Sequence, residues 1–177
     1  DQEMSRGLGD VYKRQDSARR QAIVCNHSAT HLMHSALRNT LGDHVQQKGS
    51  LVNEEKLRFD FSHKQKLSEN EIFKIEQEVN KAISSAEDTQ IIETSLEESQ
   101  KLGAIAFFGE KYGEQVRVLK IAGNYSTELC GGTHVKNSSE IKSFKIISET
   151  SISSGVRRIE AISGNLAIQD EADKKND

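Results

Sequence analysis

Two pairs of potential metal ligands in this sequence share one spacing. His27 and His31 lie four residues apart, and Cys130 and His134 repeat that spacing about a hundred residues later. Positions i and i+4 of a helix lie on one face, so both histidines of the first pair can reach a single cation. Three imidazole nitrogens and one thiolate suit tetrahedral zinc and select against magnesium and calcium. The spacings therefore predict one zinc site formed by all four residues.

The residues around each pair restrict the kind of metal site that the pairs could form. Gly131 and Gly132 follow Cys130 and allow the backbone to turn sharply and approach a ligand closely. The first pair lies in His-Ser-Ala-Thr-His, without the glutamate that serves as general base in the familiar zinc proteases, so a protease is disfavoured. Four protein ligands are also typical of a closed structural site. Spacing alone therefore leaves a catalytic and a structural zinc both open.

Two nearby residues, His34 and Cys25, are interpreted as structural residues and not as metal ligands. His34 shares the face of His31 and is a spare ligand candidate, but packing or contact behind a ligand is the favoured interpretation. Cys25 points elsewhere on the helix and is expected in the core, where free cysteine behaves as a small hydrophobic residue.

Composition restricts the class of protein. The 177 residues are 34% hydrophobic and 29% charged, which suits a single domain. No apolar run is long enough to span a membrane and no leader-like segment begins the chain, so a cytoplasmic protein is expected. Two cysteines make a disulfide framework improbable. A net charge of -3 provides no overall basic field and neither supports nor excludes an RNA partner.

The elements that must position these residues can be predicted from periodicity and capping signals. A long helix begins at Asp16 or Ser17 and ends at Gly42. A second helix begins with the Ser68 and Glu71 capping box, and a short third helix is capped by Ser95. Strands are expected at 45–52, 57–61, 90–93, 116–121, 144–148 and 156–162. This irregular alternation predicts an α+β fold with a mixed, mostly antiparallel sheet and helices packed against it.

Five blocks of this sequence together resemble the editing domain of alanyl-tRNA synthetases. They are residues 26–32 (NHSATHL), 47–52 (QKGSLV), 57–63 (LRFDFSH), 128–134 (ELCGGTH) and 155–161 (GVRRIEA). The editing module of threonyl-tRNA synthetases has similar zinc-type pairs but matches the other blocks poorly. The resemblance covers residues 16–164, whereas residues 1–15 do not continue the pattern and are interpreted as a foreign tail. Residues 165–177 are interpreted as the start of a truncated helical segment.

The resemblance implies that His27, His31, Cys130 and His134 hold zinc beside a cleft for the 3′ end of tRNA(Ala) mischarged with serine or glycine. The implied reaction is ester hydrolysis, and no DNA or membrane partner is implied. ATP would be used only in a synthetic domain that these residues do not supply. The parent enzyme would form oligomers through a missing C-terminal part.

The resemblance also implies roles for polar and basic residues. Serine is larger than alanine, so its hydroxyl must be recognised positively, and Thr30 and Gln47 are the positions implied near that hydroxyl and the attacking water. Phosphate contacts are implied for four basic residues, although structural salt bridges explain them equally well. They are Lys48, Arg58, Arg157 and Arg158.

Two other functions remain open from the sequence. A free-standing editing protein would share the zinc pairs and act on the same mischarged tRNA. A zinc-stabilised RNA-binding module would use the metal only to tie the long helix to the Cys-Gly-Gly loop. Removal of the metal discriminates the last case, because a structural zinc is needed for folding.

Overall fold

The fold is built around one long helix, α2 (Ser17–Leu41), in a computed structural model that describes residues 16–106 and 112–173. The side chain of Asp16 accepts hydrogen bonds from the backbone N–H groups of Ala18 and Arg19, which caps the N-terminus. Gly42 ends the helix with a φ of +119°, a conformation that favours glycine. Both ends agree with the sequence prediction, whereas the proposed tail at 1–15 lies outside the described residues.

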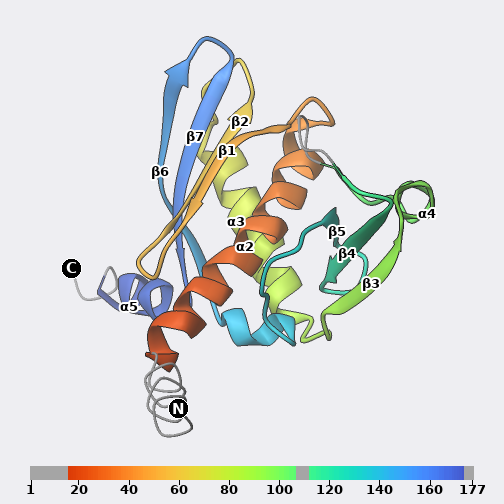
Figure 1. Ribbon diagram of the computed structural model, residues 1–177. Helices are drawn as coiled ribbons and strands as arrows, with labels where there is room; N and C mark the ends of the chain where they lie inside the picture. Colours follow the sequence, from red (N-terminus) through yellow and green to blue (C-terminus); the bar gives the residue numbers. More distant parts are fainter. Residues whose placement is uncertain (1–15, 107–111, 174–177) are drawn as a thin grey trace, which may run out of the picture.

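α2 is enclosed on all sides along its middle turns. Every residue from Val24 to Leu37 is buried except His27, which is partly exposed. The helix contacts both sheets, helix α3 (Glu69–Ser84) and the short 3₁₀ helix η1 (Ser138–Ile141). Figure 1 shows α2 crossing the molecule between the two groups of strands. A helix buried all round, and not along a single stripe, is the central element of its domain.

The larger sheet covers one side of α2. It is fully antiparallel in the order β1-β2-β7-β6. Its strands are β1 (Gln47–Val52), β2 (Leu57–Ser62), β6 (Phe144–Ser153) and β7 (Val156–Ser163). Phe59 and Phe61 on β2 are fully buried in the same core as Leu32 and Leu37 of α2. This packing fixes the long helix against the sheet.

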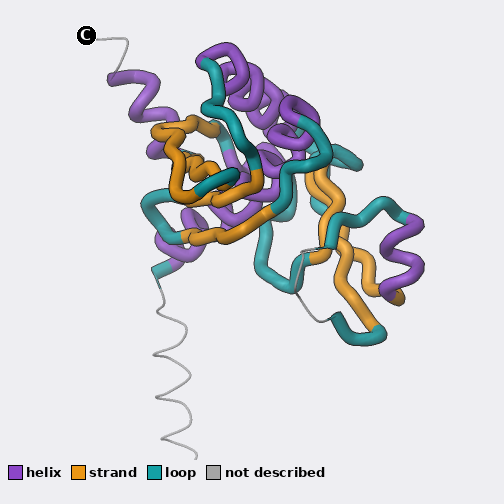
Figure 2. Tube along the Cα trace, turned by 90° about the horizontal axis from the view of Figure 1, so that it is seen from above, coloured by secondary structure: helices purple, strands orange, loops and turns teal. Residues whose placement is uncertain are grey.

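A second antiparallel sheet lies on the other side, in the order β3-β4-β5. Its strands are β3 (Gln90–Ser95), β4 (Gln115–Ile121) and β5 (Ser126–Leu129), and helix α4 (Leu96–Lys101) follows β3. Figure 2 shows this sheet and α4 set apart from the larger body. The α+β class is confirmed, but the prediction of one sheet was wrong, because α2 passes between two sheets that do not pair.

The last described element is helix α5 (Asn165–Asp173), which contacts β7 and buries Ala167. None of the helices in the described ranges combines the length and apolar character needed to cross a membrane.

Ser68 provides a test of the capping argument for α3. Its hydroxyl accepts a hydrogen bond from Glu71 N at 3.2 Å, and the Glu71 carboxylate accepts one from Ser68 N at 2.8 Å. We expect Ser68→Ala to lower the free energy of unfolding by about 1 kcal/mol, measured by urea denaturation. Ser84→Ala, at the exposed end of the same helix, is the control. Equal stability losses in both variants would contradict the capping role.

Candidate metal centre

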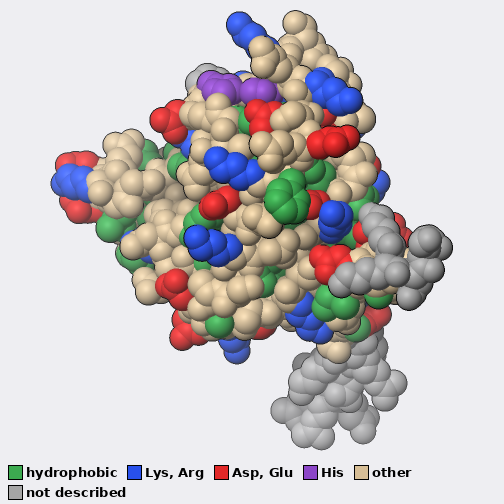
Figure 3. Space-filling view, turned by 180° about the vertical axis from the view of Figure 1, so that it is seen from behind, with side chains coloured by type: hydrophobic (Ala, Val, Ile, Leu, Met, Phe, Trp, Pro, Cys, Tyr) green, Lys and Arg blue, Asp and Glu red, His purple; other side chains and the backbone are tan. Residues whose placement is uncertain are grey.

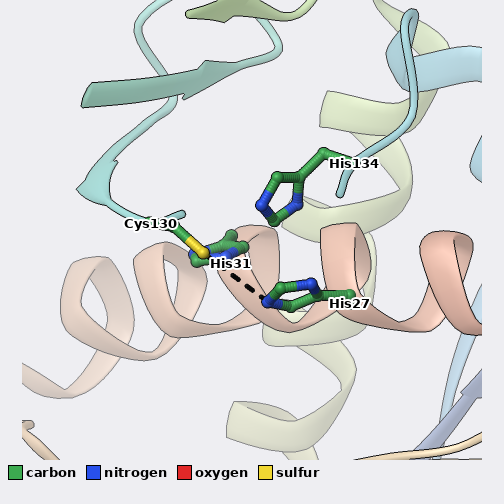
Figure 4. A group of neighbouring side chains, drawn as sticks. All are labelled: His27, His31, Cys130 and His134. Atoms are coloured by element: carbon green, nitrogen blue, oxygen red, sulfur yellow. Dashed lines mark hydrogen bonds between the residues drawn. The ribbon is translucent and has the colours of Figure 1, made fainter. Parts of the chain in front are cut away.

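The four predicted metal ligands come together from two elements. His27 and His31 lie one turn apart on α2, and Cys130 and His134 lie in the segment after β5. One ligand atom from each side chain lies within 4.8 Å of all the others. Figure 4 shows the rings and the sulfur turned toward one another. The structure thus joins two pairs that are far apart in the sequence.

The cluster has the donor atoms of a metal site, and several of its buried ring nitrogens lack a hydrogen-bond partner in the part of the chain that the structure describes. Cys130 Sγ lies 3.7 Å from His27 Nε2, and the His27 and His134 ring centroids are 4.3 Å apart. Within the described residues, His31 Nε2 and both ring nitrogens of His134 are buried without a hydrogen-bond partner. Buried polar atoms normally have partners, and a cation among them would supply one. Three nitrogens and one sulfur fit zinc.

The Cys130 thiol is held in the form that binds metals. Burial raises its pKa, but polar interactions with the rings of His134, His27 and His31 outweigh that effect and bring the pKa to about 3. A thiol with this pKa is a thiolate at neutral pH, and the thiolate is the metal ligand. Burial instead raises the pKa of Cys25, which lies in the core as predicted. Only Cys130 of the two cysteines is therefore prepared for a metal.

The segment that carries Cys130 and His134 is anchored on both sides. The guanidinium of Arg117 on β4 donates hydrogen bonds to the carbonyl oxygens of Cys130, at 3.3 Å, and Gly132, at 2.5 Å. Val135 N donates to the hydroxyl of Ser28 on α2 at 3.0 Å. Neither Arg117 nor Ser28 could be predicted from the sequence as an anchor, because a side chain that bonds to a distant backbone leaves no spacing signal.

Gly132 allows this segment to lie against α2. A Cβ atom added at Gly132 would overlap the ring of His27, whereas one at Gly131 would meet nothing within 4 Å. The predicted close approach of the Cys-Gly-Gly backbone is therefore located at the second glycine.

Glu128 is a further site residue that the sequence analysis missed. It is fully buried on β5, with Oε2 2.5 Å from His31 Nδ1 and Oε1 2.8 Å from His34 Nδ1. Burial raises the pKa of Glu128, but the two histidines outweigh it and lower the pKa to about 2. Burial lowers the pKa of His31, but Glu128 and Cys130 outweigh it and raise the pKa to about 10. His34 thus lies outside the cluster, where its ring contacts the Glu128 carboxylate and the Phe59 ring.

Thr30 and Gln47 occupy different positions relative to the cluster. Thr30 is buried one residue before His31, and its hydroxyl donates to Asn26 O at 2.8 Å. Gln47 is half-buried at the start of β1 and lines a cavity of about 150 Å³. Of the described residues, His34 and Ile105 also line this cavity, and the four cluster residues do not.

Two of the three arginines considered for phosphate binding, Arg157 and Arg158, form ion pairs with acidic side chains. Arg158 forms a two-fold contact with Asp60, at 2.7 and 2.9 Å, and Arg157 pairs with Glu149. The structure therefore supports the salt-bridge interpretation for both. On the face seen in Figure 3, acidic and basic side chains of the described residues are interspersed, without a broad region of one sign.

Comparison with known proteins relates this sequence to a family. The family described as "Threonyl and Alanyl tRNA synthetase second additional domain" matches residues 116–160, which include Glu128, Cys130 and His134. The alanine--tRNA ligase of Alkaliphilus metalliredigens is 60% identical over 80% of this chain and 16% of its own length.

Two further relatives have the same name and a similar extent of match. The alanine--tRNA ligase of Stenotrophomonas maltophilia is 54% identical over 91% of this chain and 18% of its own length. That of Pelotomaculum thermopropionicum is 52% identical over 89% of this chain and 18% of its own length. The chain spans less than a fifth of each relative. These matches show that the chain corresponds to the editing domain of alanyl-tRNA synthetases.

Proposed function

We propose that this chain hydrolyses tRNA(Ala) mischarged with serine or glycine, using zinc held by His27, His31, Cys130 and His134. The observation that carries the proposal is the cluster of three imidazoles and one thiolate-forming cysteine within 4.8 Å, in a chain that matches alanine--tRNA ligases. Zinc, when bound, can polarise an ester carbonyl or lower the pKa of a bound water. Activation of alanine with ATP is assigned, in this proposal, to other parts of a longer enzyme.

The domain limits belong to the same proposal. We assign hydrolysis to residues 16–164, and we take residues 165–177 as the beginning of a following helical segment. The cluster and its anchors Arg117 and Ser28 all lie inside the first range. The proposed partner is the 3′ end of tRNA(Ala).

An open cavity beside the cluster supports access for such a substrate. It has a volume of about 500 Å³ and reaches His27 and Thr133. Arg19 and Arg20 on the first turns of α2 line its wall. Arg19 also pairs with Glu54 at 3.0 Å, on the exposed surface. Guanidinium groups beside the cavity would position a terminal phosphate without reading a base.

Selection for serine requires recognition of its hydroxyl. A site that hydrogen-bonds a substrate hydroxyl rejects the analogue without it, because its own polar groups are then left unpaired. Thr30 and Gln47 remain our proposed contacts to the hydroxyl and the water. The Thr30 hydroxyl uses its proton on Asn26 O, so it can still accept a hydrogen bond from a substrate.

Deacylation of two matched esters tests the proposed function. We expect the zinc-loaded chain to hydrolyse Ser-tRNA(Ala) at least about 100-fold faster than Ala-tRNA(Ala) at saturating tRNA. Gln47→Ala should keep zinc and lose most of the rate, which the release of labelled amino acid measures. Equal rates for the two esters, or no hydrolysis by zinc-loaded protein, would leave the structural RNA-binding module as the better account.

A further inference from the structure

One buried carboxylate contacts two histidines with different roles. Glu128 uses Oε2 for His31 Nδ1 and Oε1 for His34 Nδ1, so both of its oxygens are occupied. His31 is a member of the four-residue cluster, and His34 is not. All three side chains are at most 5% exposed. Solvent therefore does not compete for these contacts.

We propose that Glu128 is a positioning residue that fixes the tautomer and ring orientation of His31, and that His34 holds Glu128 in place. The inference rests on the proposed zinc site. A metal ligand must be a neutral imidazole, and in the neutral tautomer with its proton on Nδ1, facing Glu128, the lone pair of His31 lies on Nε2, which has no hydrogen-bond partner among the described residues. A carboxylate on the distal nitrogen also makes the imidazole a stronger ligand.

The contact with His34 fixes the Glu128 carboxylate in a way that the contact with His31 alone would not. A carboxylate bound at one oxygen can rotate about its terminal bond, whereas contacts at both oxygens fix its plane. The ring of His34 is itself held, with its centroid 5.2 Å from that of Phe59 in the core. The backbone of Glu128 is paired with Leu119 in the β4–β5 ladder. The carboxylate is thus fixed at its backbone and at both oxygens.

The energetic cost of this arrangement favours a positioning role over a purely stabilising one. A buried ionic group is often no more stabilising than a well-packed apolar residue of similar volume. Glu128 is 1% exposed and faces imidazoles, which are weaker partners than permanently charged arginine or lysine. The presence of a carboxylate at this position is explained by its effect on the tautomer and orientation of His31.

Glu128→Gln tests the inference, since it preserves the shape and removes the charge. We expect zinc affinity, measured by competition with a chromophoric chelator, to fall about 10- to 100-fold. ¹⁵N NMR of the zinc-loaded wild-type chain should show His31 protonated at Nδ1 and bound through Nε2. This signature should be lost or mixed in the variant. His34→Phe should change affinity in the same direction by a smaller factor.

Glu76→Gln is the matched control. Glu76 is a buried carboxylate on α3 that accepts hydrogen bonds from Ile146 N, at 2.8 Å, and Lys145 Nζ, at 3.0 Å. It should lower stability while leaving zinc affinity and the His31 signature unchanged. If Glu128→Gln does not fold, Glu128→Asp takes its place, because the shorter side chain keeps the charge but cannot reach both rings.

The outcomes separate this inference from the proposed function. Wild-type zinc affinity and an unchanged His31 signature in the Glu128 variant would overturn the inference, as would an equal loss of affinity in Glu76→Gln. A wild-type chain that binds no zinc would also overturn it. Failure of zinc-loaded wild-type protein to hydrolyse Ser-tRNA(Ala) would instead remove the proposed function and leave the role of Glu128 standing.

Discussion

Cys130→Ala is expected to yield a folded protein that contains little zinc and hydrolyses Ser-tRNA(Ala) at least about 100-fold more slowly than the wild type. The substitution removes the only sulfur of the cluster and leaves three imidazoles, two of which come from α2. The hydrophobic core around α2 and the larger sheet is formed by apolar side chains outside the cluster, with Cys130 packed against it. Elemental analysis, circular dichroism and a single-turnover deacylation assay measure zinc content, folding and rate separately.

Cys25→Ala is the control for this experiment. Cys25 is the other cysteine of the chain, 6% exposed in the core, and it lies outside the four-residue cluster. It should lose some stability through the cavity it leaves, but it should keep zinc and activity. Full zinc occupancy in Cys130→Ala would reject Cys130 as a required ligand. Global unfolding of Cys130→Ala together with loss of zinc would favour the structural module.

Gly132→Ala is expected to damage the same centre without removing any ligand. The new methyl group would overlap the ring of His27, which is held by the buried turns of α2. Either the partly exposed ring of His27 or the segment with Cys130 and His134 must move, and either shift separates the donor atoms. We expect zinc affinity to fall at least about 10-fold, measured by chelator competition.

Gly131→Ala supplies the comparison for Gly132→Ala. It adds the same methyl group one residue earlier, where nothing described lies within 4 Å. Both glycines have ordinary φ values, so neither change introduces left-handed backbone strain. Zinc affinity should stay at the wild-type value in Gly131→Ala. If both variants bind zinc equally well, close approach of the loop to His27 is not needed for the site.

The sequence predicted the elements with strong local signals. The capping side chain of Asp16 and the terminal Gly42 defined α2, and the Ser68 capping box defined α3. The short strand β5 was missed, because its inward-facing residues include the polar side chains of Ser126 and Glu128 and not an apolar alternation. The residue whose polarity concealed the strand is the one that contacts two histidines.

The arrangement of the strands depended on contacts that local patterns do not encode. A strand pattern indicates a buried face but not which element covers it, so one sheet was predicted where α2 separates two. The proximity of the four candidate ligands was easier to predict, because two pairs with equal spacing constrain each other. Arg117 could not be found in this way, since it acts through backbone carbonyl oxygens.

The enclosed position of α2 has a consequence for how a metal would enter and leave. Amide hydrogens in the middle turns of α2 can exchange with solvent only when the core opens, so the backbone that carries His31 is expected to move last. The segment of Cys130 and His134 is partly exposed and is held by a few hydrogen bonds, donated by Arg117 and accepted by Ser28. Local opening should therefore release the sulfur side of the centre first, and metal exchange should proceed without unfolding of the domain.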